Sequence, residues 1–494
     1  PMICVSIGRG RHKHMIAEHK FLVEQGIELC ELRLDYITGP VKLKRLLDNR
    51  AGPVIVTCRR ERDGGRWSGD ETERQMMLRT AVVEGADYVD IEEDIAENIP
   101  RYGKTKRVIS YHNFRETPAD LGAIHARMKQ YDPDIVKLAT MANSPHDNVR
   151  MLKLVEESDV STLGLCMGEM GMPSRLLGGR AGVPFTFATS SNERTMAPGQ
   201  IGFKQMLEVY RYEKISDATK LFGVVADPVG HSLSPQLHNA AFIDRGLDAC
   251  YLPFRVPREH LQSFLEEDCP ALGIQGLSVT IPHKENAVPL LKRSDAIVQG
   301  VGATNTIVFD EQGPSGYNTD SQGAMESLES VLGTGADLTS KVVLVLGSGG
   351  VARAIAWTLK QRGADVVISG RTPEKAEALA ERLKCRNIPW NERGSVGPQI
   401  LVNGTPLGMH PNVNESPFPK EWLKASMVVF DTVYNPEQTL LIKEAREKQA
   451  KVVTGVEMFV RQAALQFKWF TGEEISRDLM RTELKRITAA VRPS

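Results

Sequence analysis

Two side chains in the first half of this sequence combine types and surroundings that suit nucleophilic and proton-transfer chemistry. Lys137 lies inside the apolar run DIVKLA (134–139), and His112 ends the apolar run RVISYH (107–112). An amine in such a run must be paired with an acid or lose its proton, because desolvation disfavours the ammonium. A neutral amine can form an imine with a ketone, and an imidazole close by can move the protons.

Both residues also have structural interpretations. Lys137 could pair with Glu31 or Asp35, because ELRLD (31–35) places Glu31, Arg33 and Asp35 on one face by alternation. His112 alone is typical of a hydrogen-bonded histidine at a strand end. The combination on successive strands favours catalysis.

A second pair of charged residues lies in the other half of the chain. Lys284 follows a strand-like run in IPHKE (281–285), and Asp320 lies at another strand–helix junction in GYNTDSQG (316–323). Each of these residues alone is typical of a solvated surface charge.

A glycine turn is the clearest local signal. The stretch KVVLVLGSGGVARAIAWTLKQRG (341–363) predicts a buried strand, the turn Gly347-Ser348-Gly349-Gly350-Val351 and an amphipathic helix. Such glycines let a pyrophosphate approach the helix N-terminus. The next strand, DVVISG, ends in Ser369-Gly370-Arg371-Thr372 and lacks the acid that binds the NAD ribose. An arginine there favours the 2′-phosphate of NADP, although Arg371 is also consistent with an ordinary surface charge.

The elements that must position Lys137 and His112 alternate between strand and helix. Eight short apolar runs are separated mostly by amphipathic stretches such as ETERQMMLRTAVVEG (71–85), and this alternation predicts parallel pairing. Eight such units in about 200 residues indicate a (β/α)8 barrel, and an open doubly wound sheet with fewer strands is the alternative. The predicted strands are 2–7, 28–34, 53–58, 88–92, 107–112, 134–139, 161–167 and 183–188.

The polar segment EKISDATK separates this barrel from a different α/β region that begins at LFGVVADPVGHSLSP. We expect a barrel domain over 1–213 and a substrate-binding lobe over 218–325, completed by C-terminal helices in 456–494. A dinucleotide-binding Rossmann lobe is expected over 326–455. Ser232 and Ser234 could simply cap the helix that starts near Pro235.

Composition excludes several other classes of protein. The chain has 494 residues, with 61 Lys and Arg against 62 Asp and Glu, so no nucleic-acid or membrane partner is expected. The N-terminal residues PMICVSIGRG enter a strand at once, and the seven cysteines show no CxxC pairing. We therefore expect a cytoplasmic protein with reduced cysteines and no metal site. The oligomeric state does not follow from the sequence.

Motifs across the first domain resemble type I 3-dehydroquinate dehydratase. They are ELRLD, TCRRERDGG, SYHNFRETP, DIVKLA, the GxxSRL pattern at 171–176 and APGQ. The resemblance implies that Lys137 forms a Schiff base with the substrate ketone, that His112 transfers protons and that Arg175 holds the carboxylate. It assigns the ring hydroxyls to Ser6, Glu31, Arg33, Arg59 and Gln200. Two positions depart from the family pattern, since Asp63 replaces the usual Glu and Met196 the usual Ser.

Motifs across the second domain resemble shikimate dehydrogenase. They are HSLSP, SVTIPHKE, GATNTI, NTD, GSGGVARA, NGTPLGM and EMFVRQA. The resemblance implies that Lys284 and Asp320 are the catalytic pair and that Gly455 and Met458 lie near the nicotinamide. Gly370 departs from the family's usual Asn-Arg-Thr, which removes one contact expected for the 2′-phosphate. The residues implied to bind the substrate carboxylate and hydroxyls are Ser232, Ser234, Thr280, Asn305, Tyr434 and Gln462.

Together the two resemblances imply consecutive reactions on one carbon ring. The barrel would convert 3-dehydroquinate to 3-dehydroshikimate, and the second domain would reduce that product to shikimate with NADPH. Two alternatives are a quinate/shikimate dehydrogenase that tolerates NAD and a regulatory relative that has lost the chemistry. Retention of all four proposed catalytic residues favours an enzyme.

Overall fold

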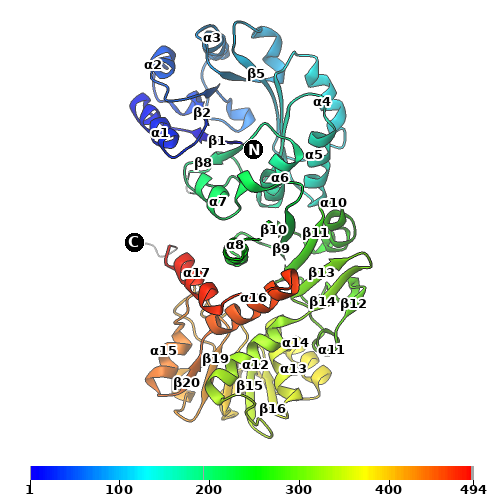
Figure 1. Cartoon of the computed structure of the whole chain (residues 1–494). Coiled ribbons are helices and arrows are strands. Elements are labelled where there is room, and N and C mark those ends of the chain that lie inside the picture. Colours follow the sequence, from blue (N-terminus) through cyan, green and yellow to red (C-terminus); the bar gives the residue numbers. More distant parts are fainter. Residues whose placement is uncertain (1, 193, 491–494) are drawn as a thin grey trace. The chain divides into compact units, whose positions relative to one another are not determined.

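A computed structural model describes residues 2–192 and 194–490 and contains two compact units (Figure 1). The first comprises residues 1–221, 228–231 and 248–273, and the second comprises 222–227, 232–247 and 274–494. Residues 1, 193 and 491–494, which fall within the predicted domain ranges, lie outside the described residues. The domain boundaries given above stay a prediction.

The first sheet has eight strands in the order β7-β6-β5-β4-β3-β2-β1-β8, and its neighbouring strands run parallel. Each strand from β1 to β6 pairs with the next along the chain, and β8 returns to pair with β1. A doubly wound sheet would instead reverse its strand order about a central strand. The barrel prediction is therefore confirmed. The strands are β1 (Met2–Ile7), β2 (Leu29–Arg33), β3 (Val54–Thr57), β4 (Tyr88–Glu92), β5 (Lys106–Asn113), β6 (Ile135–Met141), β7 (Thr162–Met167) and β8 (Phe185–Thr189).

Helices surround this curved sheet on its outer side (Figure 1). Alternate strand residues point inward, where Leu29, Ile55, Ile135, Leu163 and Phe185 belong to one apolar cluster. The polar residues that follow them at a spacing of two therefore also face the interior. The helices are α1 (His12–Glu24), α2 (Leu43–Asp48), α3 (Glu71–Val83), α4 (Leu121–Lys129), α5 (His146–Glu157), α6 (Met172–Ala181) and α7 (Phe203–Glu208).

A second, mixed sheet has the strand order β10-β9-β11-β13-β14-β12. The pairs β11–β13 and β13–β14 are antiparallel, and β12–β14 is parallel. The strands are β9 (Lys220–Ala226), β10 (Ala249–Arg255), β11 (Ile274–Val279), β12 (Arg293–Ser294), β13 (Thr306–Asp310) and β14 (Gly313–Tyr317). The associated helices are α8 (Ser234–Asp244), α9 (Leu261–Ser263), α10 (Cys269–Leu272) and α11 (Ala296–Val301).

The third sheet is parallel throughout and has the order β17-β16-β15-β18-β19-β20. Numbered from β15, this is the 3-2-1-4-5-6 order of the Rossmann fold, whose ligand site lies where the order reverses. The strands are β15 (Val342–Leu346), β16 (Asp365–Ser369), β17 (Arg386–Asn387), β18 (Ile400–Asn403), β19 (Val428–Asp431) and β20 (Lys451–Val453). Its helices are α12 (Thr319–Leu332), α13 (Gly350–Gln361), α14 (Pro373–Leu383) and α15 (Leu440–Glu447).

Two C-terminal helices, α16 (Gly455–Thr471) and α17 (Arg477–Ala490), return to the mixed sheet. Helix α16 packs on α12, β11 and β13, and α17 packs on α8. The buried Gln466 accepts a hydrogen bond from Ser278 and donates to the carbonyl of Asn305, which ties α16 to two strands. None of the described helices is both long and apolar enough to cross a membrane.

Candidate active sites

Lys137 lies in the middle of β6, with only 6% of its surface exposed. Its Nζ donates to Asp90 Oδ2 at 3.3 Å and lies 4.5 Å from the centroid of the Phe187 ring. The sequence suggested Glu31 or Asp35 as the acid partner, and this was wrong. Glu31 instead accepts hydrogen bonds from Ser6 and Thr57, and Asp35 is paired with Arg33.

Asp90, on β4, is shared among three groups. It also accepts from Ser110 Oγ at 2.6 Å, and Arg59 contacts both of its oxygens, at 3.0 and 2.9 Å. Burial alone would raise the pKa of this carboxyl, but the charges of Arg59 and Lys137 outweigh burial and hold it well below its usual range. Lys137 therefore faces a permanently ionised carboxylate that is mostly occupied by a guanidinium.

His112 is next to Lys137 in the pocket and comes from the neighbouring strand β5. Its ring is stacked on Phe114, with centroids 6.1 Å apart and planes 9° apart. Desolvation lowers its pKa well below the usual value, and the positive charges of Arg59 and Lys137 lower it further. The imidazole is therefore neutral near pH 7 and available as a base.

Arg175, on α6, is a buried cation that no carboxylate balances among the described residues. Its Nη2 donates to the carbonyl of Pro198 at 3.2 Å, and its Nε has no hydrogen-bond partner. Burial lowers its pKa to about 10. An under-satisfied guanidinium at a pocket wall suits a ligand carboxylate, which would supply the missing charge and acceptors.

Two loop residues complete the pocket wall. Gln200 Oε1 accepts from the backbone amides of Met196 and Ala197, which shapes the APGQ loop. Met196 Sδ lies 4.0 Å from Arg33 Nη1, where the dehydratase family usually has a serine. The other departure, Asp63, accepts from Arg60 at 2.7 Å.

These side chains surround a pocket of about 480 Å³ at the C-terminal ends of the barrel strands. Of the barrel residues predicted to form the site, Ser6 alone is not at its wall, because its hydroxyl supports Glu31 from behind. The lining residues are Glu31, Arg33, Arg59, Asp63, Gly64, His112, Phe114, Lys137, Ala139, Leu165, Met167, Arg175, Phe187, Met196, Ala197 and Gln200.

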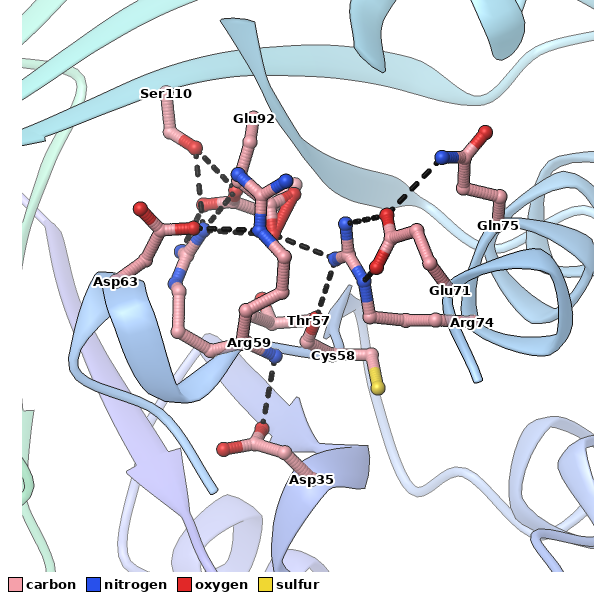
Figure 2. Close-up of polar contacts among 12 residues, drawn as sticks. Asp35, Thr57, Cys58, Arg59, Asp63, Glu71, Arg74, Gln75, Glu92 and Ser110 are labelled. Atoms are coloured by element: carbon pink, nitrogen blue, oxygen red, sulfur yellow. Dashed lines mark hydrogen bonds and ion pairs between the residues drawn. The ribbon is translucent and has the colours of Figure 1, made fainter. Parts of the chain in front are cut away.

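Sequence reasoning missed the acids of β4, Asp90 and Glu92, as well as Arg74, a buried cation on α3 that pairs with Glu92 (Figure 2). The signal was present, because YVDIE carries two acids at a spacing of two inside a run predicted to be a strand. The same alternation had identified Glu31 and Arg33 on β2.

In the second site, the two predicted catalytic residues contact each other directly. Lys284 Nζ donates to Asp320 Oδ2 at 2.7 Å, and both side chains are largely buried. Asp320 lies in the first turn of α12, where Asn318 caps the helix by accepting from the amides of Asp320 and Ser321. The backbone of Lys284 is held by Thr304, whose amide donates to its carbonyl at 2.8 Å.

Lys284 also lies against the glycine turn. A β-carbon at Gly350 would lie 2.7 Å from Lys284 Cδ, so a side chain there would displace the lysine. Gly347 has φ +106° and closes the turn by donating to the carbonyl of Ser369. The catalytic pair proposed from the sequence and the dinucleotide motif therefore meet at one place in the fold.

The substrate-binding residues predicted for this unit lie at several different places in the fold. Asn305 and Thr319 exchange hydrogen bonds at 2.9 and 2.8 Å, and Thr319 donates to the carbonyl of Gln462. The Tyr434 ring is stacked on Phe459 at 4.1 Å, and burial raises the pKa of Tyr434 to about 12.

Of the remaining three substrate residues, Ser232 and Thr280 lie on the loops that follow β9 and β11, and Ser234 is the first residue of α8. The Thr280 amide donates to Val225. Ser232 Oγ accepts from the Ser234 amide at 3.3 Å, but Leu233 is the N-cap of α8 and no described side chain caps this helix, so the capping alternative is wrong.

The turn fits a dinucleotide. Gly349 is exposed, with no atom within 4 Å of a β-carbon position, and Gly350 opens α13. Ser348 is half-buried, Val351 packs at the edge of the apolar core, and Arg371 and Thr372 are exposed beyond β16. A β-carbon at Gly370 would lie 3.7 Å from Ser348 Oγ, so position 370 borders the turn.

Two predicted cofactor residues lie at the start of α16. A β-carbon at Gly455 would lie 2.2 Å from the Val433 carbonyl, so only glycine fits there. Met458 is buried in the apolar core of the parallel sheet. Its side chain is packed against protein, and a role towards the nicotinamide stays a prediction.

The fold and the two sites define a chain of two enzyme units, a barrel with a buried lysine in its pocket and a Rossmann unit with a dinucleotide turn. Residues 3–217 match the family model described as type I 3-dehydroquinase. Residues 224–307 match the shikimate dehydrogenase substrate binding domain, 329–393 match shikimate/quinate 5-dehydrogenase and 455–485 match the shikimate 5′-dehydrogenase C-terminal domain.

One relative, from Arabidopsis thaliana, is described as a chloroplastic bifunctional 3-dehydroquinate dehydratase/shikimate dehydrogenase. It is 37% identical over 504 residues, which cover 97% of this chain and 83% of the relative. The chain therefore belongs to the family of bifunctional 3-dehydroquinate dehydratase/shikimate dehydrogenases.

Other similar proteins match the second half alone. The NADP⁺-dependent shikimate dehydrogenase of Methanosarcina mazei is 41% identical over 53% of this chain and 96% of its own. A crystal structure of a shikimate dehydrogenase with NADP⁺ is 37% identical, with a TM-score of 0.51 over 55% of this chain and 96% of that one. A quinate dehydrogenase from Corynebacterium glutamicum with NAD is 28% identical, with a TM-score of 0.50 over 54% of this chain and 99% of that one.

Proposed function

We propose that Lys137 and His112 dehydrate 3-dehydroquinate in the barrel, and that Lys284 and Asp320 serve the NADP-dependent reduction of 3-dehydroshikimate to shikimate. Family membership supports the two activities. The observation that carries the assignment of residues is the barrel pocket, where a buried amine, a neutral imidazole and an unpaired guanidinium meet.

In the barrel, the neutral amine of Lys137 adds to the substrate ketone and loses water to form an imine. The protonated imine withdraws electrons and acidifies the adjacent C–H. His112 takes that proton and then returns it to the departing hydroxyl, so one imidazole serves both transfers. Hydrolysis of the imine releases the enone product and restores the amine.

Substrate orientation in the barrel follows from charge. Arg175 binds the carboxylate, because it is the buried cation without an acid of its own. The ring hydroxyls face polar groups that are already fixed by other bonds, namely Glu31, Arg33, Arg59 and Gln200. Ser6 acts from behind by holding Glu31.

In the second site, NADP supplies the hydride when bound. Gly347, Ser348, Gly349, Gly350 and Val351 form the turn that would receive its pyrophosphate, and Arg371 would meet the 2′-phosphate. Lys284 gives a proton to the oxygen that develops charge, and Asp320 holds the ammonium in place at 2.7 Å.

We assign the substrate of the second site to the loops and helix ends around that pair. Asn305 and Gln462 both contact Thr319, the neighbour of Asp320, and Tyr434 stacks on Phe459 of α16. Ser232 and Thr280 lie on the loops after β9 and β11, and Ser234 is the first residue of α8.

A second candidate function for this half is quinate/shikimate dehydrogenase activity with NAD. The likeness to a quinate dehydrogenase bound to NAD favours it, as does Gly370 in place of asparagine. The values of kcat/KM for NADP against NAD, and for shikimate against quinate, separate the two. A preference for NAD and quinate would replace the shikimate assignment.

Borohydride trapping tests the barrel assignment directly. Reduction in the presence of 3-dehydroquinate should attach the substrate to the peptide that contains Lys137 and leave the Lys284 peptide unlabelled, which serves as the internal control. The regulatory alternative predicts no label on either peptide. That result would remove the Schiff-base assignment.

The cellular location is the remaining proposal. Free and mostly buried cysteines are consistent with a reducing cytoplasm. The Arabidopsis relative is described as chloroplastic, so fractionation of the source cells is the deciding measurement.

A further inference from the structure

Six charged side chains form a line from the surface of α3 to the barrel pocket. We call Glu71, Arg74, Glu92, Arg59, Asp90 and Lys137 the charge chain. Acids and bases alternate along it, with three of each, and the four central members are almost fully buried. Its contacts are Glu71–Arg74 at 2.6 Å, Arg74–Glu92 at 2.6 Å, Glu92–Arg59 at 3.6 Å, Arg59–Asp90 at 2.9 Å and Asp90–Lys137 at 3.3 Å.

Arg74 is the member with the most complete set of contacts. Its side chain has no exposed surface and donates four hydrogen bonds, two to Glu71, one to Glu92 and one to the carbonyl of Cys58 (Figure 2). Asp70 caps α3 four residues earlier and fixes where this helix begins. Arg74 is absent from the pocket wall, so it contacts no substrate.

Glu92 lies between two guanidinium groups but is bonded to only one. Its Oε1 is 2.6 Å from Arg74 Nη1 and 3.6 Å from Arg59 Nη1, and its Oε2 has no partner. Arg59 makes its short contacts with Asp90 and Ser110 instead. The distances indicate that Arg74 satisfies Glu92 and thereby leaves Arg59 to Asp90.

We propose that Arg74 is a positioning residue for the dehydration reaction, which acts through Glu92 to hold Arg59 on Asp90 and so limits how much of the Asp90 charge is available to Lys137. The proposal rests on the proposed role of Lys137 as the imine-forming amine. Arg59 and Lys137 compete for one carboxylate, and the 3.3 Å contact of Lys137 is the weaker.

Loss of the Arg74 charge would unbalance the chain. Glu92 would keep Arg59 as its remaining cation partner, and a small movement of Nη1 would turn the 3.6 Å contact into a hydrogen bond. Asp90 would then be left to Lys137, which favours the ammonium and slows imine formation near neutral pH. Loss of the Glu92 charge should have the opposite effect on imine formation, because Arg59 then stays wholly on Asp90.

Other charged groups also face these residues and stay unchanged in the experiment. Those around Lys137 in the pocket are Glu31, Arg33, Asp63, His112 and Arg175, and Arg60 lies near Arg74 and Glu92. A difference between variants therefore reports on the charge chain.

The test is the pH dependence of the rate of borohydride trapping and of kcat/KM for dehydration in the full chain. For Arg74→Gln, the pH of half-maximal rate should rise by at least about 0.5 unit, the size expected when one charge near a partly buried pair is removed. Glu92→Gln should lower it, and Arg74→Gln with Glu92→Gln should return it to within about 0.2 unit of the wild-type value, because the charges balance again.

Arg107 supplies the matched control. It is also a buried barrel arginine, but it donates to the carbonyls of Ala96, Ile99 and Asp132, and no contact connects it to the charge chain among the described residues. Arg107→Gln should cost stability without moving the pH profile. Reductase activity reports the amount of chain in each sample whose second unit is folded.

Three results would overturn the proposal: an unchanged profile for Arg74→Gln, a double variant that does not return towards wild type, or a Glu92→Gln profile that moves upward. Should Arg74→Gln fail to fold, the Glu92→Gln and double variants still decide the sign. Absence of any trapped adduct in the wild-type chain would instead refute the proposed function of Lys137.

Discussion

The chain contains two lysine–aspartate pairs in different surroundings. In the barrel, Lys137 is 3.3 Å from Asp90, which also binds Arg59 at both oxygens and accepts from Ser110. In the second unit, Lys284 is 2.7 Å from Asp320, whose side-chain contact with a cation is this pair alone among the described residues.

The difference matches the role that we propose for each lysine. A lysine that attacks a ketone has to give up its proton, and a carboxylate already occupied by a guanidinium holds an ammonium weakly. A lysine that donates a proton benefits from an undivided carboxylate close by, which keeps it charged and oriented. Under the proposed function, the same two residue types serve a nucleophile in one region and an acid in the other, according to how many cations share the aspartate.

The largest expected effect separates the two lysines. Lys137→Ala should lower kcat for dehydration by at least about 1,000-fold, because no other amine in the described pocket can form the imine. Reduction of 3-dehydroshikimate should be unaffected. Lys284→Ala should give the reverse pattern, and separate assays of the two reactions measure both. Dehydration at the wild-type rate by Lys137→Ala would show that Lys137 does not form the imine, and would contradict the roles proposed for the two lysines.

The next largest effect is expected from removal of the Asp320 carboxylate charge, which pairs with Lys284. Asp320→Asn preserves shape but loses the charge that holds Lys284, so kcat for reduction should fall by about 100-fold. The KM for NADP should change by less than about threefold, since the glycine turn is intact. Steady-state kinetics with varied NADPH measure both values. A large rise in KM with unchanged kcat would make Asp320 a binding residue.

A smaller effect is expected from a change in the residue that favours NADP over NAD. Arg371→Ser should raise the KM for NADP by about tenfold, or about 1.4 kcal/mol, and leave the KM for NAD unchanged. Arg386→Ser is the matched control, because Arg386 is another exposed arginine of the same lobe and pairs with Asp365. Equal effects of the two variants would show that Arg371 is an ordinary surface charge.

The lowered pKa of His112 has a consequence for stability. As pH falls through about 6.5, the unfolded chain takes up a proton on this residue while the folded barrel does not, so the free energy of unfolding decreases. His112→Gln should therefore lose less stability between pH 6.5 and 5.5 than the wild type, by up to about 1.4 kcal/mol per pH unit.

Urea unfolding at pH 8, 6.5 and 5.5 measures this difference. Trp67 is the only tryptophan of residues 1–217 and reports on the barrel. Other barrel histidines with lowered pKa, such as His19 and His125, are present in both proteins and cancel. Parallel pH profiles would show that His112 is charged in the fold.

The smallest effect is expected at Met196. Restoring the family's usual residue with Met196→Ser adds a hydroxyl beside Arg33 at the pocket wall. One hydrogen bond of about 1 kcal/mol should lower the KM for 3-dehydroquinate by about fivefold without a change in kcat. A drop in kcat would mean that the thioether packs usefully against the substrate.

Much of this architecture could be predicted from local patterns. All eight barrel strands lie within two residues of their predicted limits, because buried parallel strands are near-continuous apolar runs between helical stretches. The strand, glycine turn and helix predicted over 341–363, the following strand DVVISG and the C-terminal helices were likewise confirmed. The short strands β12, β14 and β17 were missed, since two-residue or glycine-rich strands carry little hydrophobic pattern.

The sequence by itself determined which residues are candidates for chemistry and which element carries each one, since motif and periodicity are local properties of the chain. Only the tertiary structure decided their partners. It paired Lys137 with Asp90 rather than Glu31 or Asp35, placed Ser6 behind the pocket wall and paired Arg74 of α3 with Glu92 of β4. The physical reason is that strands far apart in sequence share one closed interior, where burial forces each charge to find whichever opposite charge the register brings within reach.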